Sequence, residues 1–314
     1  MSLSEFAGLE IAVVIPCYNE ALTIAGVVED FRKALPTAAI WVFDNNSRDG
    51  TADIAARAGA RVIRERRQGK GNVVRRMFAE VDADIYLMAD GDGTYDPQGA
   101  PKLIRTLIDE RCDMVVGTRK GVHDDAGRKG HAVGNRIFNT IYQSLFGRDF
   151  TDIFSGYRAF TRRFAKSFPA LSHGFEIETE MSVHASELRM PIAEVELDYG
   201  RRPEGSHSKL STFKDGFRIL WMIARLTKET RPVFFYGAFA FAFALLGIFL
   251  SVPLLATYIE TGLVPRLPTA ILSTGLMLTS FLMMACGLIL DSVAQGRVEQ
   301  KRMLYLGLEP LKLQ

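Results

Sequence analysis

The sequence has few cysteines and no strong excess of charge of either sign. The cysteines are Cys17, Cys112 and Cys286, and no two of them have C-x-x-C spacing. This pattern argues against a disulfide framework or a zinc site, and it fits a reducing compartment. The formal net charge is +2 and charged residues make up 24% of the chain. The composition therefore indicates neither a nucleic-acid-binding protein nor a disordered chain.

The N-terminus also lacks the features of a cleaved signal peptide. Residues 1–10 show no basic start followed by an apolar stretch, which is the pattern that secretory signals share. No internal repeat or low-complexity segment is visible either. We therefore expect the N-terminal domain to stay in the cytoplasm.

The N-terminal two thirds of the chain alternate between strand and helix patterns. Apolar runs typical of buried strands lie at residues 11–15, 39–43, 61–63, 85–89 and 113–117. Helical patterns at 21–35 and 51–58 separate the first three of these runs. Such alternation predicts a mainly parallel α/β sheet with helices on both faces. Ligands of these sheets bind at the carboxyl ends of the strands, so the polar residues there are the candidates for function.

The composition changes abruptly after Arg231. Residues 232–259 contain no charged side chain, and neither do residues 267–290. A membrane-spanning helix needs about 20 apolar residues, so both runs are long enough. Basic residues precede the first run and follow the second, which predicts a multi-pass inner or plasma membrane protein with both ends in the cytoplasm. The alternative is a pair of buried core helices.

Residues 213–230 join these two parts and place apolar and basic side chains on opposite sides of a helix. This pattern favours a helix that lies among the lipid headgroups. The alternative is an ordinary helix packed on the catalytic domain. The predicted organisation is thus a domain at 1–212, a juxtamembrane helix at 213–231, and a two-helix transmembrane region with a tail at 232–314.

Acidic residues follow two of the predicted strands. Asp90 and Asp92 lie on a turn directly after the 85–89 strand, and Asp44 ends the 39–43 strand. Two carboxylates separated by one residue can approach Mg²⁺ or Mn²⁺ together, although acidic turn residues are also common. Asp44 could accept hydrogen bonds from a base or ribose. Asp49 and Thr51 have an alternative role in the turn and the helix cap.

The first strand ends in Pro16, Tyr18, Asn19 and Glu20, which adds an aromatic face and two polar groups. Three strand ends therefore carry polar clusters. Because neighbouring parallel strands end at the same edge of a sheet, these clusters outline one nucleotide-sized pocket.

Read in order, these residues resemble the motifs of family 2 glycosyltransferases with the GT-A fold. The matching segments are Pro16-x-Tyr18-Asn19-Glu20, Asp44-x-x-Ser47-x-Asp49-Gly50-Thr51, Gly69-Lys70-Gly71, Asp90-x-Asp92, Gly117-Thr118-Arg119, Asp152-x-x-Ser155-Gly156-x-Arg158, Phe175-Glu176 and Arg202-x-x-Gly205-Ser206-x-Ser208-Lys209-Leu210. The set resembles the branch of dolichol-phosphate mannose synthase and bacterial polyprenyl-phosphate glycosyltransferases. It covers roughly residues 10–215, and the paired apolar runs resemble the two-span bacterial members.

The resemblance implies roles on the donor side of the site. The residues expected at the nucleoside are Pro16, Tyr18, Glu20, Asp44 and Asn46, with Lys70 close by. Asp90 would face the sugar or the diphosphate, and Asp90 and Asp92 would hold Mg²⁺ or Mn²⁺. Some relatives have a glutamine two residues after the second aspartate as a further ligand. This chain has Thr94 there, which puts metal ligation by residue 94 in doubt.

The resemblance also implies a set of phosphate-binding residues. Arg119 and Arg202 would stabilise the reacting phosphate groups, and Arg119, Arg136, Ser206 and Lys209 would bind the acceptor phosphate. Read alone, Arg202 and Lys209 have the alternative of solvated surface charges. Asp152 and Glu176 match acidic positions of the family, and their roles stay open.

The implied activity is inverting transfer of a sugar from a nucleotide-sugar to a polyprenyl phosphate such as undecaprenyl or dolichyl phosphate. A UDP-sugar is slightly favoured over a GDP-sugar, and the sugar itself stays open. The apolar runs also allow a homo-oligomer. One alternative is a processive polysaccharide synthase, but neither Trp41 nor Trp221 ends the Gln-x-x-Arg-Trp motif of that branch. The other is a non-catalytic nucleotide-sugar-binding membrane protein.

Overall fold

The computed structural model of the chain describes residues 6, 8–120, 143, 149–174, 176–200, 221, 224–264 and 266–311. The chain divides into two compact units. The first comprises residues 1–216 together with 301–314, and the second comprises residues 217–300. The end of the chain therefore belongs to the first unit, whereas the sequence analysis grouped it with the transmembrane region.

The first unit is built on one seven-stranded sheet with the strand order β3-β2-β1-β4-β6-β5-β7. The strands are β1 (Ile11–Cys17), β2 (Ala39–Asp44), β3 (Arg61–Arg64), β4 (Ile85–Met88), β5 (Met114–Lys120), β6 (Arg158–Thr161) and β7 (Ile192–Asp198). All neighbouring strands are parallel except β6, which is antiparallel to both β4 and β5. The predicted mainly parallel α/β sheet is confirmed.

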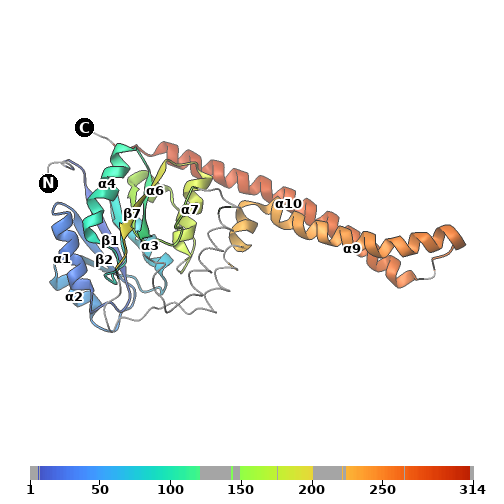
Figure 1. Cartoon of the computed structure of the whole chain (residues 1–314), viewed down its shortest axis with the longest axis horizontal. Coiled ribbons are helices and arrows are strands. Elements are labelled where there is room, and N and C mark those ends of the chain that lie inside the picture. Colours follow the sequence, from blue (N-terminus) through green and yellow to red (C-terminus); the bar gives the residue numbers. More distant parts are fainter. Residues whose placement is uncertain are drawn as a thin grey trace. The chain divides into compact units, whose positions relative to one another are not determined.

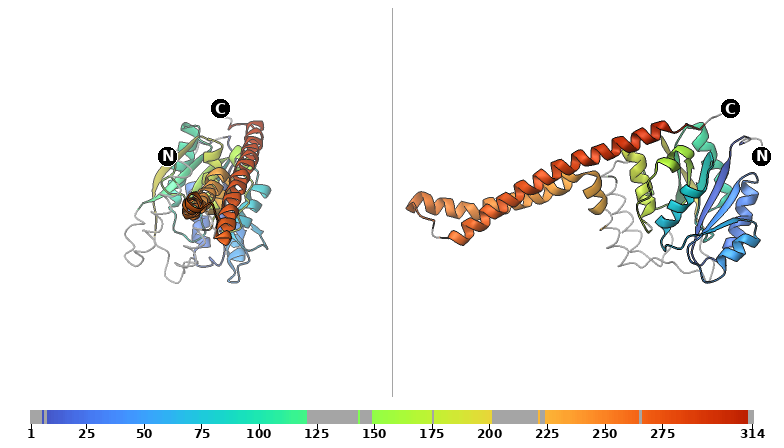
Figure 2. Two further views of the ribbon diagram at one scale, coloured as in Figure 1. Left: turned by 90° about the vertical axis from the view of Figure 1, so that its right-hand side faces the viewer. Right: turned by 180° about the vertical axis from the view of Figure 1, so that it is seen from behind.

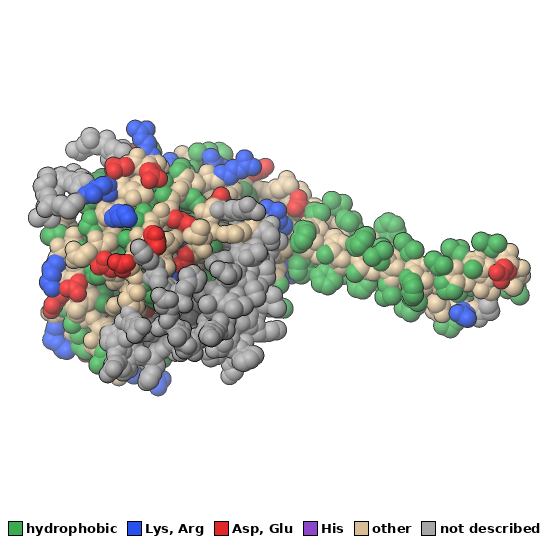
Figure 3. Space-filling view, in the orientation of Figure 1, with side chains coloured by type: hydrophobic (Ala, Val, Ile, Leu, Met, Phe, Trp, Pro, Cys, Tyr) green, Lys and Arg blue, Asp and Glu red, His purple; other side chains and the backbone are tan. Residues whose placement is uncertain are grey.

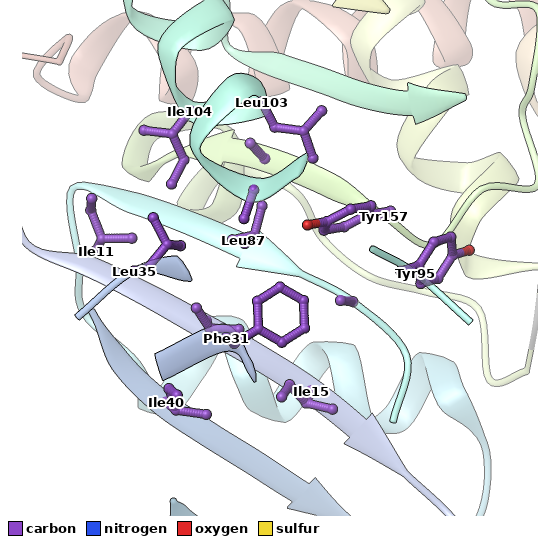
Figure 4. Close-up of a cluster of buried hydrophobic side chains, with 14 of the residues drawn as sticks. Ile11, Ile15, Phe31, Leu35, Ile40, Leu87, Tyr95, Leu103, Ile104 and Tyr157 are labelled. Atoms are coloured by element: carbon purple, nitrogen blue, oxygen red, sulfur yellow. The ribbon is translucent and has the colours of Figure 1, made fainter. Parts of the chain in front are cut away.

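Helices lie on both faces of this sheet (Figure 1). They are α1 (Ile24–Ala34), α2 (Thr51–Arg57), α3 (Lys70–Glu80), α4 (Ala100–Asp109), α6 (Arg162–Ser167) and α7 (Ile177–Glu187), with a short 3-10 helix at Pro97–Gly99. Figure 4 shows Phe31 of α1 and Leu103 of α4 among the side chains of β1 and β4. Every residue of β1 is buried. Burial on both faces explains why this strand reads as a continuous apolar run.

The five strands predicted from apolar runs are all present, with ends that shift by one to three residues. β6 and β7 were not predicted. β6 begins with Arg158, which is fully buried. Its guanidinium donates hydrogen bonds to the carbonyl oxygens of Ser155 (2.8 Å) and Ile153 (2.9 Å) and to Ser182 Oγ (3.0 Å). A buried, fully paired arginine interrupts the apolar pattern by which a central strand is recognised.

The second unit contains two long apolar helices. These are α9 (Pro232–Thr261) and most of α10 (Leu267–Gly307), which run side by side (Figure 2). Ser273 Oγ donates to the carbonyl oxygen of Gly247 (2.9 Å), and Ser280 Oγ donates to that of Ala240 (2.7 Å). Small residues thus bring the two backbones close, as in membrane helix pairs.

Most of the surface of these two helices is not covered by protein. In the most apolar windows, only 11% of α9 and 6% of α10 are buried. Hydrophobic side chains cover the outside of both helices in Figure 3. The alternative of buried core helices is therefore wrong. Both helices are long and apolar enough to cross a membrane. α10 also continues past the apolar run to Gly307.

The last turns of α10 belong to the first unit and are fixed there by a buried polar cluster. Tyr305 is 4% exposed, and its hydroxyl donates to Asp113 Oδ2 at 2.6 Å. Arg163 donates two hydrogen bonds of 2.7 Å to the same carboxylate. The Arg163 guanidinium also lies 4.4 Å from the centre of the Tyr305 ring. The chain thus leaves the first unit after residue 216 and returns to it at residue 301.

Asp113→Ala is expected to lower the free energy of unfolding of the first unit by about 2–4 kcal/mol. The change leaves the Arg163 guanidinium and the Tyr305 hydroxyl without their shared acceptor. Asp82→Ala is a matched control, because Asp82 pairs with Arg162 at 2.8 Å on the surface. An exposed pair of this kind contributes about 1 kcal/mol or less. Urea unfolding in detergent measures both variants, and equal effects would contradict a stabilising role for the cluster.

Candidate active site

Three of the strands that carry predicted site residues end side by side. β1 lies between β2 and β4, with Cys17 opposite Asp44 and Val14 opposite Met88. The polar residues after these strands therefore gather at one edge of the sheet. This is the arrangement that the sequence predicted, and it is where open α/β sheets bind ligands.

The loops after β1 and β2 are tied together by hydrogen bonds. The backbone N–H groups of residues 19, 20 and 21 donate to Ser47 Oγ (2.9 Å), Thr51 Oγ1 (2.9 Å) and Asp49 Oδ2 (3.0 Å). The other oxygen of Asp49 accepts from the Thr51 hydroxyl at 2.5 Å. Asp49 and Thr51 therefore have the structural role that the sequence left open. Their bonds fix the loop that carries Tyr18 and Glu20.

Asp44 is buried next to this loop, with 3% of its surface exposed. Among the described residues, its Oδ1 has no hydrogen-bond partner. A buried acceptor without a partner costs free energy unless a ligand donor reaches it. This atom is therefore suited to accept a hydrogen bond from a bound nucleoside, as the resemblance implies for Asp44.

Asn46 holds the segment that follows β3. Its side-chain amide donates to the carbonyl oxygen of Arg66 at 2.6 Å. Asn45 donates in the same way to the carbonyl oxygens of Glu65 (3.1 Å) and Arg67 (2.8 Å). A hollow of about 670 Å³ opens beside Asn46. Its lining residues are Asn46, Arg64, Glu65, Arg66, Arg67 and Arg76. The excess of arginine makes this side of the predicted nucleotide pocket attractive to anions.

The turn that carries Asp90 and Asp92 depends on glycine. A Cβ on Gly91 would lie 2.5 Å from Cys17 Sγ, and Gly93 has a φ of +74°. Asp92 is 3% exposed, and its Oδ1 accepts from the backbone N–H (3.1 Å) and the hydroxyl (2.6 Å) of Thr94. Thr94 thus orients the Asp92 carboxylate.

The donor set of this turn fits a hard divalent cation. Within the described parts of the chain, no group of three or more His, Cys, Asp and Glu side chains is placed to hold a metal. Mg²⁺ is commonly bound through one or two carboxylates and shares its remaining positions with substrate phosphates and water. Asp90 and Asp92 would supply such carboxylates.

Lys70 lies between two carboxylates. Its Nζ is 2.5 Å from Asp90 Oδ1 and 2.6 Å from Glu178 Oε1. Lys70 is the first residue of α3, and Glu178 lies in the first turn of α7. The sequence analysis placed Lys70 near the nucleotide and did not single out Glu178. Little in the sequence indicates that Glu178 belongs to the site. It lies 108 positions after Lys70, and only the nearby Glu176 matches a family motif.

Arg119, at the carboxyl end of β5, forms a bidentate pair with Asp152. Its Nε and Nη2 donate to the two carboxylate oxygens at 2.7 and 2.9 Å. Burial alone would lower the pKa of Arg119, but the pair with Asp152 keeps this pKa above its ordinary value. A guanidinium has five N–H donors and Asp152 takes two. The remaining donors are those with which Arg119 would contact a phosphate, and Asp152 is the group that orients it.

Four of the predicted acceptor-side residues lie outside the described residues. They are Arg136, Arg202, Ser206 and Lys209. The predicted helix at 213–230 is described only at residue 221 and from residue 224 onward. His184 is 2% exposed, and burial lowers its pKa to about 3, so its ring is neutral at physiological pH.

The sheet order, the antiparallel β6 and the acidic turn after β4 define a GT-A-type glycosyltransferase domain. Residues 12–168 match the glycosyl transferase family 2 pattern. The chain belongs to this family, and it is an enzyme of the glycosyltransferase class.

Two relatives that are named as glycosyltransferases agree with this assignment. The chain is 38% identical to the glycosyltransferase AglJ of Haloferax volcanii over 243 residues, which is 77% of this chain and 80% of that protein. It is 29% identical to a dolichyl-phosphate hexose transferase of the same organism, covering 73% of this chain and 99% of that one. A 159-residue match at 50% identity covers 51% of this chain and 98% of an uncharacterised protein of Shigella flexneri.

Solved structures support the same fold. Glucosyl-3-phosphoglycerate synthase of Mycobacterium tuberculosis, in complex with phosphoglyceric acid, has a TM-score of 0.59 and 25% identity. The match covers 73% of this chain and 84% of that one. The same enzyme with Mn²⁺, UDP and glucosyl-3-phosphoglycerate has a TM-score of 0.60 and 24% identity, at the same coverage. The second of these complexes contains a divalent cation and a uridine nucleotide.

Proposed function

We propose that this glycosyltransferase moves a sugar from a nucleotide-sugar to a polyprenyl phosphate at the cytoplasmic face of a membrane. The observation that carries the proposal is that two long, exposed apolar helices belong to the same chain as a family 2 catalytic domain. A polyprenyl chain stays in the bilayer because its apolar surface is large. An enzyme with its own membrane helices meets such an acceptor at the headgroup plane. The similarity to a dolichyl-phosphate hexose transferase supports the same acceptor class.

The path of the chain supports a hairpin in the membrane. Residues 1–216 and 301–314 form one unit, and α9 and the apolar part of α10 lie between them in sequence. A chain that leaves a unit and returns to it crosses the bilayer an even number of times. Two crossings place both ends of the hairpin on the side of the catalytic domain. The basic residues at both ends favour the cytoplasm as that side.

A phosphate acceptor removes the need for a general base. The second pKa of a phosphate monoester is about 6, so the acceptor is mostly a dianion at neutral pH. One of its oxygens attacks the anomeric carbon and forms the new C–O bond. The bond to the diphosphate breaks with its electron pair, and nucleoside diphosphate leaves. In-line attack inverts the anomeric carbon and gives a β-linked product from an α-linked donor.

The site must then overcome repulsion between two anionic substrates. Two cations near the reacting groups are already paired, Lys70 with Asp90 and Glu178, and Arg119 with Asp152. They therefore orient groups more than they add positive charge. A divalent cation on Asp90 and Asp92 would supply charge at the leaving diphosphate. Arg136, Arg202 and Lys209 would supply it at the acceptor.

Membranes that contain this protein are expected to transfer labelled sugar into undecaprenyl phosphate from one nucleotide-sugar of a panel, in the presence of Mg²⁺ or Mn²⁺. UDP-sugars are the first donors to test. NMR of the product is expected to show an inverted anomeric configuration. Absence of lipid product from every donor, with a folded protein, would contradict the proposed acceptor. A retained configuration would contradict the mechanism alone.

A further inference from the structure

Glu178 is a buried carboxylate that contacts Lys70 in addition to Asp90. The side chain of Glu178 is 5% exposed and that of Lys70 is 9% exposed, whereas that of Asp90 is 28% exposed. Among the described residues, Glu178 Oε2 is buried without a hydrogen-bond partner. Asp90 is therefore the most exposed member of this cluster, and Glu178 is the member most enclosed by protein.

The cluster is also closed by the backbone. A Cβ on Gly156 would lie 3.1 Å from both Asp90 Oδ2 and Lys70 Nζ. The backbone N–H of Gly156 donates to the Tyr95 hydroxyl at 2.8 Å, which fixes its position. Lysine is a flexible side chain with a point charge. A second carboxylate in contact with the ammonium restricts its position more than one carboxylate does.

Two effects on the pKa of Glu178 oppose each other in this arrangement. Burial raises the pKa of the Glu178 carboxyl, while the Lys70 ammonium opposes the rise. Without Glu178, the buried ammonium would keep its 2.5 Å contact with Asp90 and could follow that side chain when a donor binds. With Glu178, the ammonium has a second contact of 2.6 Å that holds it in place.

We infer that Glu178 is a positioning residue of the transferase site: it holds Lys70 in place, and Lys70 in turn fixes the Asp90 carboxylate toward the donor. This inference rests on the proposed role of Asp90 at the donor sugar or diphosphate. Because Glu178 is enclosed by protein and contacts Lys70 at 2.6 Å, it acts on the donor site through Lys70.

Glu178→Gln keeps the shape of the side chain and removes its charge. We expect kcat/KM for the nucleotide-sugar to fall by about 10- to 100-fold, the range typical of groups that orient a ligand-binding carboxylate. Affinity for the nucleoside monophosphate is expected to stay within about twofold, because the residues predicted to contact the nucleoside lie at the ends of β1 and β2. A general loss of folding would lower both kcat/KM and the affinity for the nucleoside monophosphate. Glu187→Gln is the matched control, since Glu187 lies in the same helix and pairs with Lys301 at 3.1 Å.

A double-mutant cycle with Lys70→Gln tests whether Glu178 acts through Lys70. If it does, Glu178→Gln has little further effect on kcat/KM once Lys70 is changed. Full additivity of the two changes would overturn the inference and favour direct contact with the substrate. Wild-type rates in Glu178→Gln alone would also overturn it, even if the Lys70 variant does not fold. A wild-type protein that makes no lipid product would instead contradict the proposed function.

Discussion

Asp92→Asn is expected to reduce sugar transfer by about a hundredfold to a thousandfold. The side chain is buried on the turn after β4, and Thr94 holds one of its oxygens through two hydrogen bonds. Asparagine keeps that acceptor and the side-chain shape, so the fold is retained. What it loses is the negative charge for a divalent cation at the diphosphate. Such a cation stabilises the transition state by several kcal/mol, and each ~1.4 kcal/mol is a factor of ten in rate.

The measurement is the initial rate of transfer as a function of Mn²⁺ concentration. The variant is expected to need more metal and to remain slower at saturation. Asp96→Asn is the matched control, because Asp96 caps the 3-10 helix through the backbone N–H of Gln98 at 2.9 Å. Asparagine caps helices as well as aspartate does, so this variant should keep its activity. An Asp92 variant with an unchanged rate and an unchanged metal requirement would show that this carboxylate does not hold the cation.

The second large effect is expected when the apolar helices are replaced. A variant in which a flexible Gly/Ser linker of about 30 residues replaces residues 217–300 should bind nucleotide as the wild type does. Such a linker has a typical end-to-end distance of about 30 Å. The rate at which this variant transfers sugar to long polyprenyl phosphate in vesicles should fall by at least about 100-fold. Membrane anchoring raises the effective concentration of a membrane-bound substrate by about 10²–10⁴, and the linker removes this gain.

The boundaries of this replacement follow from the structure. Removing everything after residue 212 would also remove Tyr305, whose hydroxyl donates to the buried Asp113. Loss of activity would then report damage to the catalytic domain. The linker variant keeps residues 301–311, and a short-chain, water-soluble prenyl phosphate serves as the control acceptor. Transfer to the short acceptor should persist. Undiminished transfer to the long acceptor in vesicles would contradict the role of the helices in presenting the lipid.

The strands and the apolar helices could be predicted because each is defined by a local pattern. Buried parallel strands are continuous apolar runs, and β1, β2, β4 and β5 all have this pattern. α9 and α10 were predicted because few other structures require more than 20 consecutive uncharged residues. β6 was missed because its first residue, Arg158, is a buried charge. The continuation of α10 to Gly307 was missed because it lies beyond the apolar run.

The candidate site shows the same division between local pattern and long-range contact. Asp44, Asp90 and Asp92 stand directly after buried strands, so the sequence alone placed them at one edge of the sheet. It could not show that Thr94 orients Asp92, or that Asp49 accepts hydrogen bonds that fix the loop. Those roles depend on which donor faces which oxygen, and that is set by the turn geometry.

The sequence by itself determined the fold class, the strand ends that meet at one edge of the sheet and the two apolar helices, because each follows from residue type and local spacing. Only the tertiary structure decided the partners of the buried charges. Lys70 meets Glu178 across 108 residues, Arg119 meets Asp152 across 33, and Asp113 meets Tyr305 across 192. A buried charge must find an opposite charge or a hydrogen bond somewhere in the fold. The packing of distant elements decides which residue becomes that partner, and the local spacing of residues does not reveal it.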